Sequence, residues 1–311
     1  MSAFKWFASL VLAATVVPTL TAETHCPGNV ASVPFRFVDR HRIVLAVSIN
    51  HAGPYNFLLD SGTQITMIDL SLAAELHLDT QGPALVAGAG SRQSAFFAQV
   101  DLVEAGSHAV ADQKVLVYDL QNLHSADLHI QGILGEDFLE HFDMLIDNAH
   151  RLLCLDNSAA MRAEVKGPHI PLVAAAKPED GAALPRLLII EVRLSAARRP
   201  VRLMLDSGAN APVLFNTSQY MAFNTSQYMA LQPSQSVPSR GNGVDGAQRI
   251  FSALSPQDVK IGSLELSRVP FFTLAGAQKD ARLKGFDGVL PAGLFRRVFI
   301  DHADHFAVLE P

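Results

Sequence analysis

The sequence predicts a mostly β protein built from two homologous, barrel-like lobes with short helices. An apolar run that ends in Asp-Ser-Gly occurs twice, at residues 57–62 and 202–208. Each copy follows a second strand-like apolar run, and each half closes on a similar hydrophobic signature. A stretch rich in Ala, Pro and Gly separates the halves. The predicted organisation is a leader at 1–22, a first lobe at 23–156, a linker at 157–185 and a second lobe at 186–311.

The length and composition of the chain fit two folded lobes. The 311 residues are 49% hydrophobic, which is enough apolar surface for two cores. Lys and Arg number 24 against 30 Asp and Glu, a formal net charge of −6. Because the sequence contains no basic run and no basic-aromatic patch, we expect no nucleic-acid partner.

Residues 1–22 predict a secretory signal peptide. A mostly apolar run at 6–20 is followed by small residues at 21–22, a pattern typical of a cleavage site. The run is short for a membrane span and is interrupted by Pro18, so we expect no stable membrane insertion after cleavage. The alternative is an uncleaved anchor, because Leu20 is large for its place before the cleavage site. The mature protein is expected to be exported, either periplasmic or secreted.

The two cysteines of the chain, Cys26 and Cys154, allow two interpretations. In an oxidising compartment they could pair and tie the N-terminal segment to the first lobe. The alternative is a buried thiol at Cys154 and a loose one at Cys26. The sequence leaves both open.

Each Asp-Ser-Gly motif is expected at the end of a β-hairpin. In the first half, residues 43–49 lead through a turn at 51–54 into the motif. In the second half, residues 187–194 lead through a turn at 196–200 into the other copy. A short helix is expected to begin at Ser71.

The residue types of the motif suit a buried polar turn. The two copies are Asp60-Ser61-Gly62 and Asp206-Ser207-Gly208. A carboxylate directly after an apolar strand is costly to bury alone, so it needs partners. Gly permits a tight turn, and the Ser hydroxyl can donate a hydrogen bond inward. Two ordinary strand-to-turn transitions are the alternative, but the match between the halves extends well beyond the tripeptide.

Residues 58–63 (Leu-Leu-Asp-Ser-Gly-Thr) and 204–209 (Met-Leu-Asp-Ser-Gly-Ala) resemble the active-site signature of aspartic proteases, and their flanks are similar to the retropepsin-like branch. The resemblance implies a bilobal acid-protease fold with Asp60 and Asp206 as the catalytic dyad. It also implies loop support, in which the serines brace the two loops against each other and the glycines set the turns. The supporting residues are Ser61, Gly62, Ser207 and Gly208.

Paired carboxylates point to an aspartic endopeptidase acting on peptides or proteins. Two carboxyl groups within a few ångströms share one proton, so one can activate water while the other protonates the peptide carbonyl. This chemistry needs no metal and no cofactor. A monomer is favoured over a homodimer. The alternatives are a site formed between lobes of two chains, and an inactive peptide-binding protein of the same fold.

Residues 133–135 (Ile-Leu-Gly) resemble the strand that threads beside the active-site loop in such proteases. In the second half, Pro291 stands where Gly is expected. Because Pro fixes φ and removes a donor, the local geometry there is left open. Mobile hairpins, or flaps, are expected at Gly-rich tips between strands. The flap candidates are Gly88, Gly90, Gly241 and Gly243.

Residues 215–222 and 223–230 are identical octapeptides. The spacing from Asp-Ser-Gly to the closing signature is longer in the second half by about this length, so we expect the second copy to be an insertion. One copy is expected to pack like the first-lobe helix and the other to loop outward.

Residues 302–305 (His-Ala-Asp-His) have a spacing that can suggest metal binding. They align with residues 148–150, which follow Asp147 at an expected hairpin turn. We therefore expect a solvated turn and no metal site. The Gly-X-Ser-X-Gly motif of serine hydrolases is absent from the sequence.

Overall fold

The computed structural model describes residues 25–38, 41–88, 91–124, 128–174, 185–197, 199–215, 239–242, 248–274 and 285–311. The expected signal peptide and the octapeptides beyond Phe215 lie outside these ranges, so those expectations remain predictions. The domain boundaries likewise remain predictions.

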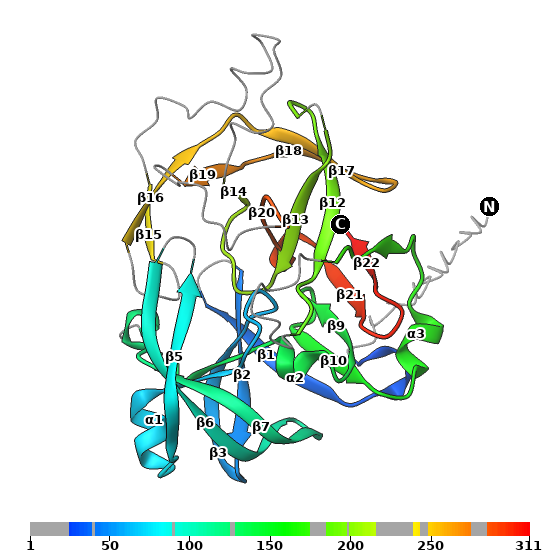
Figure 1. Cartoon of the computed structure of the whole chain (residues 1–311). Coiled ribbons are helices and arrows are strands. Elements are labelled where there is room, and N and C mark those ends of the chain that lie inside the picture. Colours follow the sequence, from blue (N-terminus) through cyan, green and yellow to red (C-terminus); the bar gives the residue numbers. More distant parts are fainter. Residues whose placement is uncertain are drawn as a thin grey trace, which may run out of the picture.

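Two β-sheets make up most of the described chain, which confirms the predicted mostly β, bilobal fold class (Figure 1). In spatial order, the 13-stranded sheet consists of β11 (Ile170–Pro171), β22 (Phe306–Glu310), β21 (Arg297–Asp301), β9 (Asp143–Asp147), β10 (Leu152–Asp156), β1 (Ser32–Val38), β2 (Arg42–Ile49), β3 (Ala52–Leu59), β8 (Gly132–Leu134), β4 (Met67–Asp69), β7 (His108–Tyr118), β6 (Ser91–Ala105) and β5 (Thr80–Gly88). The nine-stranded sheet consists of β15 (Ser239–Asn242), β16 (Gln248–Ala253), β19 (Phe272–Leu274), β14 (Val213–Leu214), β20 (Gly288–Pro291), β13 (Val201–Asp206), β12 (Ile189–Leu194), β17 (Gln257–Ile261) and β18 (Leu264–Val269).

The helices are short, as the sequence predicts. They are α1 (Leu70–Glu75), α2 (Glu136–Leu139) and α3 (Ala160–Glu164), with 3₁₀ turns at Pro27–Asn29, Gln121–Leu123 and Ala292–Leu294. The helix expected from Ser71 is α1, which begins one residue earlier because Asp69 caps it by accepting from the Ser71 N–H. Within the described ranges, no helix is long and apolar enough to cross a membrane.

Both predicted hairpins are present, as β2–β3 and β12–β13. In β3 successive side chains point to opposite faces, and both faces are buried at its last three residues, 57–59. Phe57 and Leu59 pack in the main core, and Leu58 packs in a second cluster. This double burial explains why the strand reads as a continuous apolar run rather than an alternating one.

The last two strands of the chain belong to the sheet of the first lobe. β21 pairs antiparallel with β9, with Phe299 opposite Leu145, and β22 pairs with β21. In Figure 1 these C-terminal strands (red) lie beside the green strands β9 and β10. The two halves of the chain are therefore joined through one continuous sheet.

Arg162 of α3 holds three carboxylates at this junction. Its guanidinium lies 3.1 Å from Asp143 of β9, 2.6 Å from Asp301 of β21 and 2.7 Å from Asp304. Asp301 has no exposed surface, so its charge depends on such a partner. Within the predicted linker, residues 160–164 thus form α3 and take part in this junction.

A disulfide joins Cys26 and Cys154, which decides between the two interpretations of the cysteines. Both side chains are buried, in a cluster with Leu145, Met161 and Phe299. The bond ties the segment before β1 to β10 and spans 128 residues of sequence. Closing so long a loop removes much of the entropy of the unfolded chain.

Replacing both cysteines, as Cys26→Ser with Cys154→Ser, should lower the free energy of unfolding by about 2–5 kcal/mol because the unfolded chain regains that entropy. Denaturant unfolding measures the change, and the reduced wild-type protein should match the variant. Mass spectrometry of the unreduced protein should also show a linked peptide pair. Two freely alkylated thiols under oxidising conditions would contradict the bond.

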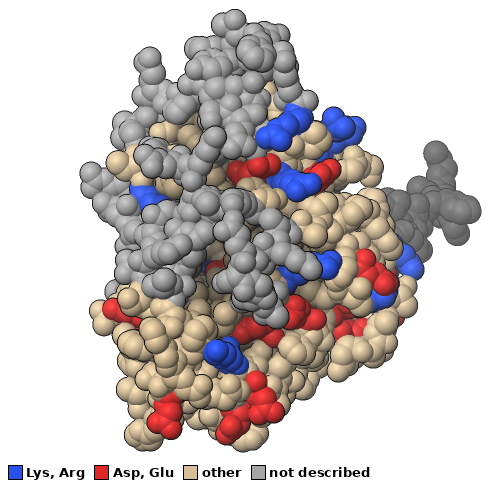
Figure 2. Space-filling view, in the orientation of Figure 1, with Lys and Arg blue, Asp and Glu red and all other residues tan. Residues whose placement is uncertain are grey.

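On the face drawn in Figure 2, acidic and basic side chains of the described residues are interspersed. No continuous basic area is visible on that face among these residues.

Candidate active site

Each lobe brings one carboxyl group to the end of a buried strand. Asp60 follows β3 directly, and Asp206 is the last residue of β13. β3 runs parallel to β8, and β13 runs parallel to β20. In the first lobe the Asp60 N–H donates to the Leu134 carbonyl at 3.0 Å. The strand expected at residues 133–135 thus lies beside the first motif, as the resemblance implies.

Pro291 is accommodated at the end of β20. Its backbone is extended, with φ −60° and ψ 131°, and it stays in register with Asp206. Its first-lobe counterpart, Gly135, has no such freedom, because a Cβ there would lie 2.8 Å from the Thr63 carbonyl oxygen. The two lobes therefore differ in how tightly this strand packs against the active-site loop.

Four reciprocal hydrogen bonds join the two motifs. The Ser61 N–H donates to Ser207 Oγ at 3.0 Å, and the Ser207 N–H donates to Ser61 Oγ at 3.1 Å. The Ser61 hydroxyl donates to the Leu205 carbonyl and the Ser207 hydroxyl donates to the Leu59 carbonyl, both at 2.9 Å. Both serines are buried, so these bonds are sheltered from competing water. They fix the two Asp-bearing loops against each other.

Gly62 and Gly208 let the two carboxyl groups approach. A Cβ on Gly208 would lie 2.6 Å from the carboxyl carbon of Asp60, and one on Gly62 would lie 2.9 Å from that of Asp206. Each loop's glycine therefore faces the other loop's carboxylate. The carboxyl groups are hydrogen-bonded to each other. The motif needs Gly for this contact across the lobes, in addition to the turn.

The backbone also holds each carboxyl group in place. The Gly62 N–H donates to Asp60 Oδ1 at 2.8 Å, and the Gly208 N–H donates to Asp206 Oδ1 at 2.8 Å. Burial raises the pKa of Asp60, while hydrogen bonds from Thr63 and Gly62 hold back part of the rise. Burial and the adjacent Asp60 charge raise the pKa of Asp206 well above its ordinary value. The buried pair therefore favours retention of one shared proton.

Thr63 makes the pair asymmetric, a role that was not predicted from the sequence. Its hydroxyl donates to Asp60 Oδ2 at 2.8 Å, which stabilises the ionised form. The equivalent residue of the second motif is Ala209, which has no hydroxyl. The sequence feature that could have indicated this role is the difference between Thr63 and Ala209 in the aligned motifs.

Only part of the predicted flap region is described. Gly88 is the last residue of β5, and Gly88 pairs with Ser91 at the start of β6. Gly241 lies within β15, which pairs with β16. Gly90 and Gly243 lie outside the described residues. Both predicted glycine-bearing segments thus belong to β-hairpins.

The turn at residues 302–305 is present, but the expectation that it is solvated is wrong for His302. The His302 side chain is only 10% exposed, and its Nε2 lies 3.1 Å from Glu136 Oε2. Its Nδ1 lies 2.6 Å from the Phe142 carbonyl oxygen. Glu136 has no exposed surface, so its carboxyl group needs such a partner. Glu136 and His302 are 166 residues apart in sequence. In the described part of the chain, no group of three or more potential ligands is arranged to hold a metal.

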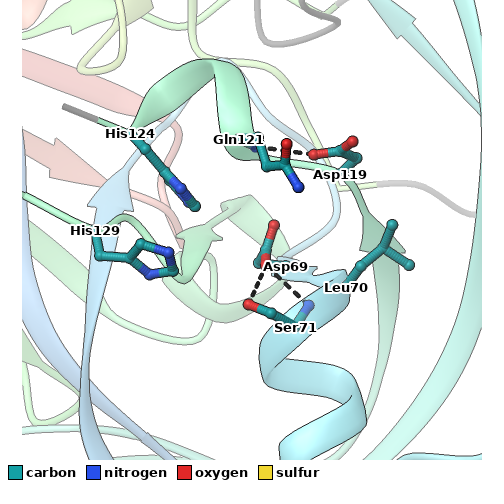
Figure 3. A pocket seen from close by; sticks show the side chains of 7 residues that line it. All are labelled: Asp69, Leu70, Ser71, Asp119, Gln121, His124 and His129. Atoms are coloured by element: carbon teal, nitrogen blue, oxygen red, sulfur yellow. Dashed lines mark hydrogen bonds between the residues drawn. The ribbon is translucent and has the colours of Figure 1, made fainter. Parts of the chain in front are cut away.

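A cavity of about 350 Å³ lies apart from the paired motifs, where the parallel strands β4 and β7 end. Figure 3 shows its lining side chains, which are Asp69, Leu70, Ser71, Asp119, Gln121, His124 and His129. The rings of His124 and His129 are 3.7 Å apart between centroids. Asp69 is occupied by the helix cap and by the Leu120 N–H. None of these residues belongs to either Asp-Ser-Gly loop.

A two-lobed β fold in which two Asp-Ser-Gly loops meet defines the class of acid proteases. Residues 45–138, which run from β2 into α2, match the family model described as aspartyl protease. The match covers less than half of the chain and supports an aspartyl protease family of the retropepsin-like type. No curated protein matches the sequence.

Proposed function

We propose that the protein is an aspartic endopeptidase whose active site is formed within one chain by Asp60 and Asp206. The reciprocal bonding of Ser61 and Ser207 is the observation that carries the proposal. It brings two carboxyl groups from opposite lobes into hydrogen-bonding contact. Two buried carboxyl groups held close together repel each other when both are ionised, which destabilises the fold. Stability therefore does not explain this arrangement, whereas catalysis does.

In the proposed mechanism Asp60 is the base and Asp206 is the acid. Asp60 takes a proton from a bound water, and the water oxygen attacks the peptide carbonyl carbon. Asp206 gives its proton to the carbonyl oxygen, which yields a tetrahedral diol. Asp60 then passes its proton to the leaving nitrogen as the C–N bond breaks, and Asp206 recovers a proton from a diol hydroxyl. The Thr63 hydroxyl supports this division of roles, because it favours the ionised form of Asp60.

The proposed substrate is an extended peptide or a protein segment. An extended chain can pair its backbone with strand edges while its side chains enter apolar pockets. The proposal includes export to the periplasm or the medium, which the disulfide supports because such bonds persist in oxidising compartments. We propose a monomer as the active unit.

Cleavage of a peptide library by the mature protein, from about pH 3 to pH 7.5, tests this function. We expect internal peptide bonds to be cut, with kcat/KM following a bell-shaped curve whose optimum lies below neutral pH. The rise reports ionisation of Asp60, and the fall reports loss of the second proton from the pair. Peptide binding without cleavage at every pH would favour the inactive binding protein instead.

Changing Thr63→Val should move the acidic limb of that profile to higher pH by about 0.5–1 unit. The Thr63 hydroxyl lowers the pKa of Asp60. Its loss should raise that pKa, so a higher pH is needed to ionise Asp60. Thr63→Ser keeps a hydroxyl and is the matched control, with an acidic limb close to that of the wild type. Equal profiles for all three proteins would show that Thr63 does not tune Asp60.

A further inference from the structure

The buried pair of Glu136 and His302 lies directly behind the active-site loop of the first lobe. Glu136 begins α2, and its N–H donates to the Thr63 carbonyl at 2.9 Å. Thr63 in turn donates its hydroxyl to Asp60 at 2.8 Å and its N–H to the Asp60 carbonyl at 3.1 Å. His302 is therefore linked to Asp60 by three hydrogen bonds, which are joined by the covalent structure of Glu136 and Thr63.

The pair also connects the two halves of the chain. His302 follows β21 in the C-terminal half, whereas Glu136 and Phe142 belong to the first half. In the opposite direction, the Asn148 side chain follows β9 and donates to the carbonyls of Ala292 and Phe295 at 3.1 and 2.9 Å. Asn148 and His302 occupy equivalent places after β9 and β21. A residue of each half thus contacts the turn that follows a strand of the other half. These strands are β8 and β20, which lie beside the two Asp-Ser-Gly loops.

Only one of these two contacts can change its charge. In the second lobe, Ala209 replaces Thr63 and Ala292 replaces Glu136, and the crossing residue is the neutral Asn148. The ionisable contact is confined to the lobe of Asp60, which is the proposed base.

The chemistry of the pair requires a proton between the two side chains. His302 Nδ1 faces a carbonyl oxygen, so Nδ1 carries a hydrogen. Its Nε2 meets a carboxyl oxygen, so the contact is either imidazolium with carboxylate or imidazole with carboxylic acid. Glu136 Oε1 is buried and has no hydrogen-bond partner among the residues that the structure describes, so Oε2 makes the bond that holds the group in place.

The surroundings favour retention of that proton. Burial raises the pKa of Glu136, and its contact with His302 opposes the rise only in part. Burial acts to lower the pKa of His302, but Glu136, the Phe142 carbonyl and Asp143 outweigh it and raise that pKa. The nearby charged groups are Asp137 of α2, Glu140 directly after α2, and Asp143 of β9, which also binds Arg162.

We propose that Glu136 and His302 are positioning residues for the reaction, forming a clasp across the lobes that sets the Thr63 backbone so that the Thr63 hydroxyl reaches Asp60. This inference rests on the proposed function. The clasp acts through Thr63 and does not touch the substrate. His302, from the C-terminal half, thereby affects the position of the loop that carries Asp60 and Thr63.

The test compares Glu136→Gln, His302→Gln and the counterpart Asn148→Ala as the matched control. Glu136→Gln keeps the shape but replaces the ionisable contact with a weaker neutral amide hydrogen bond to His302, so the loop should loosen and kcat should fall about tenfold with little change in KM. The acidic limb of kcat/KM should move to higher pH by about 0.5–1 unit, as for Thr63→Val. Asn148→Ala should lower Tm but leave the acidic limb in place, because it does not contact the first loop.

A double variant separates positioning from general stability. If the clasp acts through Thr63, Glu136→Gln combined with Thr63→Val should shift the acidic limb no further than Thr63→Val alone. Additive shifts, or a fall in Tm with an unchanged limb in Glu136→Gln, would overturn the inference.

A readout that needs no activity keeps this test separate from the proposed function. Titration of the Asp60 carboxyl carbon by ¹³C NMR should show a raised pKa in Glu136→Gln but not in Asn148→Ala. A wild-type protein that cuts no peptide would refute the proposed function, while the titration would still report on the clasp. An unchanged Asp60 titration in Glu136→Gln would refute the clasp even in an active enzyme.

Discussion

Asp60→Asn and Asp206→Asn are each expected to lower kcat for peptide hydrolysis by about three to five orders of magnitude. Asn keeps the shape of the side chain but can neither take a proton from water nor hold the shared proton of the pair. Because the two carboxyl groups act as a unit, the double variant should lose little more than either single variant. Steady-state rates on a peptide that the wild type cuts would measure the effect.

The control for this comparison is Asp119→Asn, at the cavity apart from the dyad. Asp119 is exposed, and among the described residues it accepts from the Gln121 N–H, a bond that the amide oxygen of Asn can also accept. Its activity should equal that of the wild type. Circular dichroism and Tm should show that both dyad variants are folded. A dyad variant that keeps more than about a tenth of the wild-type rate would contradict the assigned roles.

Gly208→Ala should produce the second large effect, a loss of about a hundredfold or more in kcat. The added methyl group would meet the Asp60 carboxyl carbon at 2.6 Å and both of its oxygens at 2.8 Å. The carboxyl group would have to move, and a displacement of about 1 Å from the reacting geometry is enough for such a loss. The rate on the same peptide measures the change.

Gly262→Ala is the matched control for added bulk. Gly262 lies in the turn between β17 and β18, where a Cβ would meet nothing within 4 Å. Its φ of +58° makes the substitution mildly strained, so we expect a lower Tm and full activity. Gly208→Ala with normal kcat would mean that the two loops are not packed against each other as described.

The sequence predicts those parts of the fold that local patterns determine. β3 and β13 are short apolar runs with turn residues on both sides, so their place and their carboxyl ends follow from composition alone. The repeat of the motif then indicates that the two carboxyl groups belong together. The pairing of the lobes follows from the resemblance, because no local pattern specifies it.

Local sequence patterns do not indicate which distant segments come into contact. Nothing in the residues around His302 indicates a buried Glu partner 166 positions earlier. Likewise, the pairing of β21 with β9 depends on how the halves dock. The disulfide stayed open for the same reason, since bonding requires proximity that a single sequence does not report.

The division of roles between the two carboxyl groups could be predicted from the sequence only in part. The aligned motifs differ as Thr63 against Ala209, which a single sequence shows. Its meaning required the geometry, because only the structure places the Thr63 hydroxyl on Asp60. Internal repeats thus reveal a shared site most readily, while their differences reveal how the site is divided.

The central claim is that one chain supplies both carboxyl groups of one active site. Co-refolding Asp60→Asn with Asp206→Asn in equal amounts and measuring peptide hydrolysis tests it most directly. If the dyad is intramolecular, no chain in the mixture has a complete pair, and the mixture should be as inactive as either variant alone. Recovery of a substantial fraction of wild-type activity in the mixture, or full activity of Asp206→Asn alone, would contradict the claim and place the site between two chains.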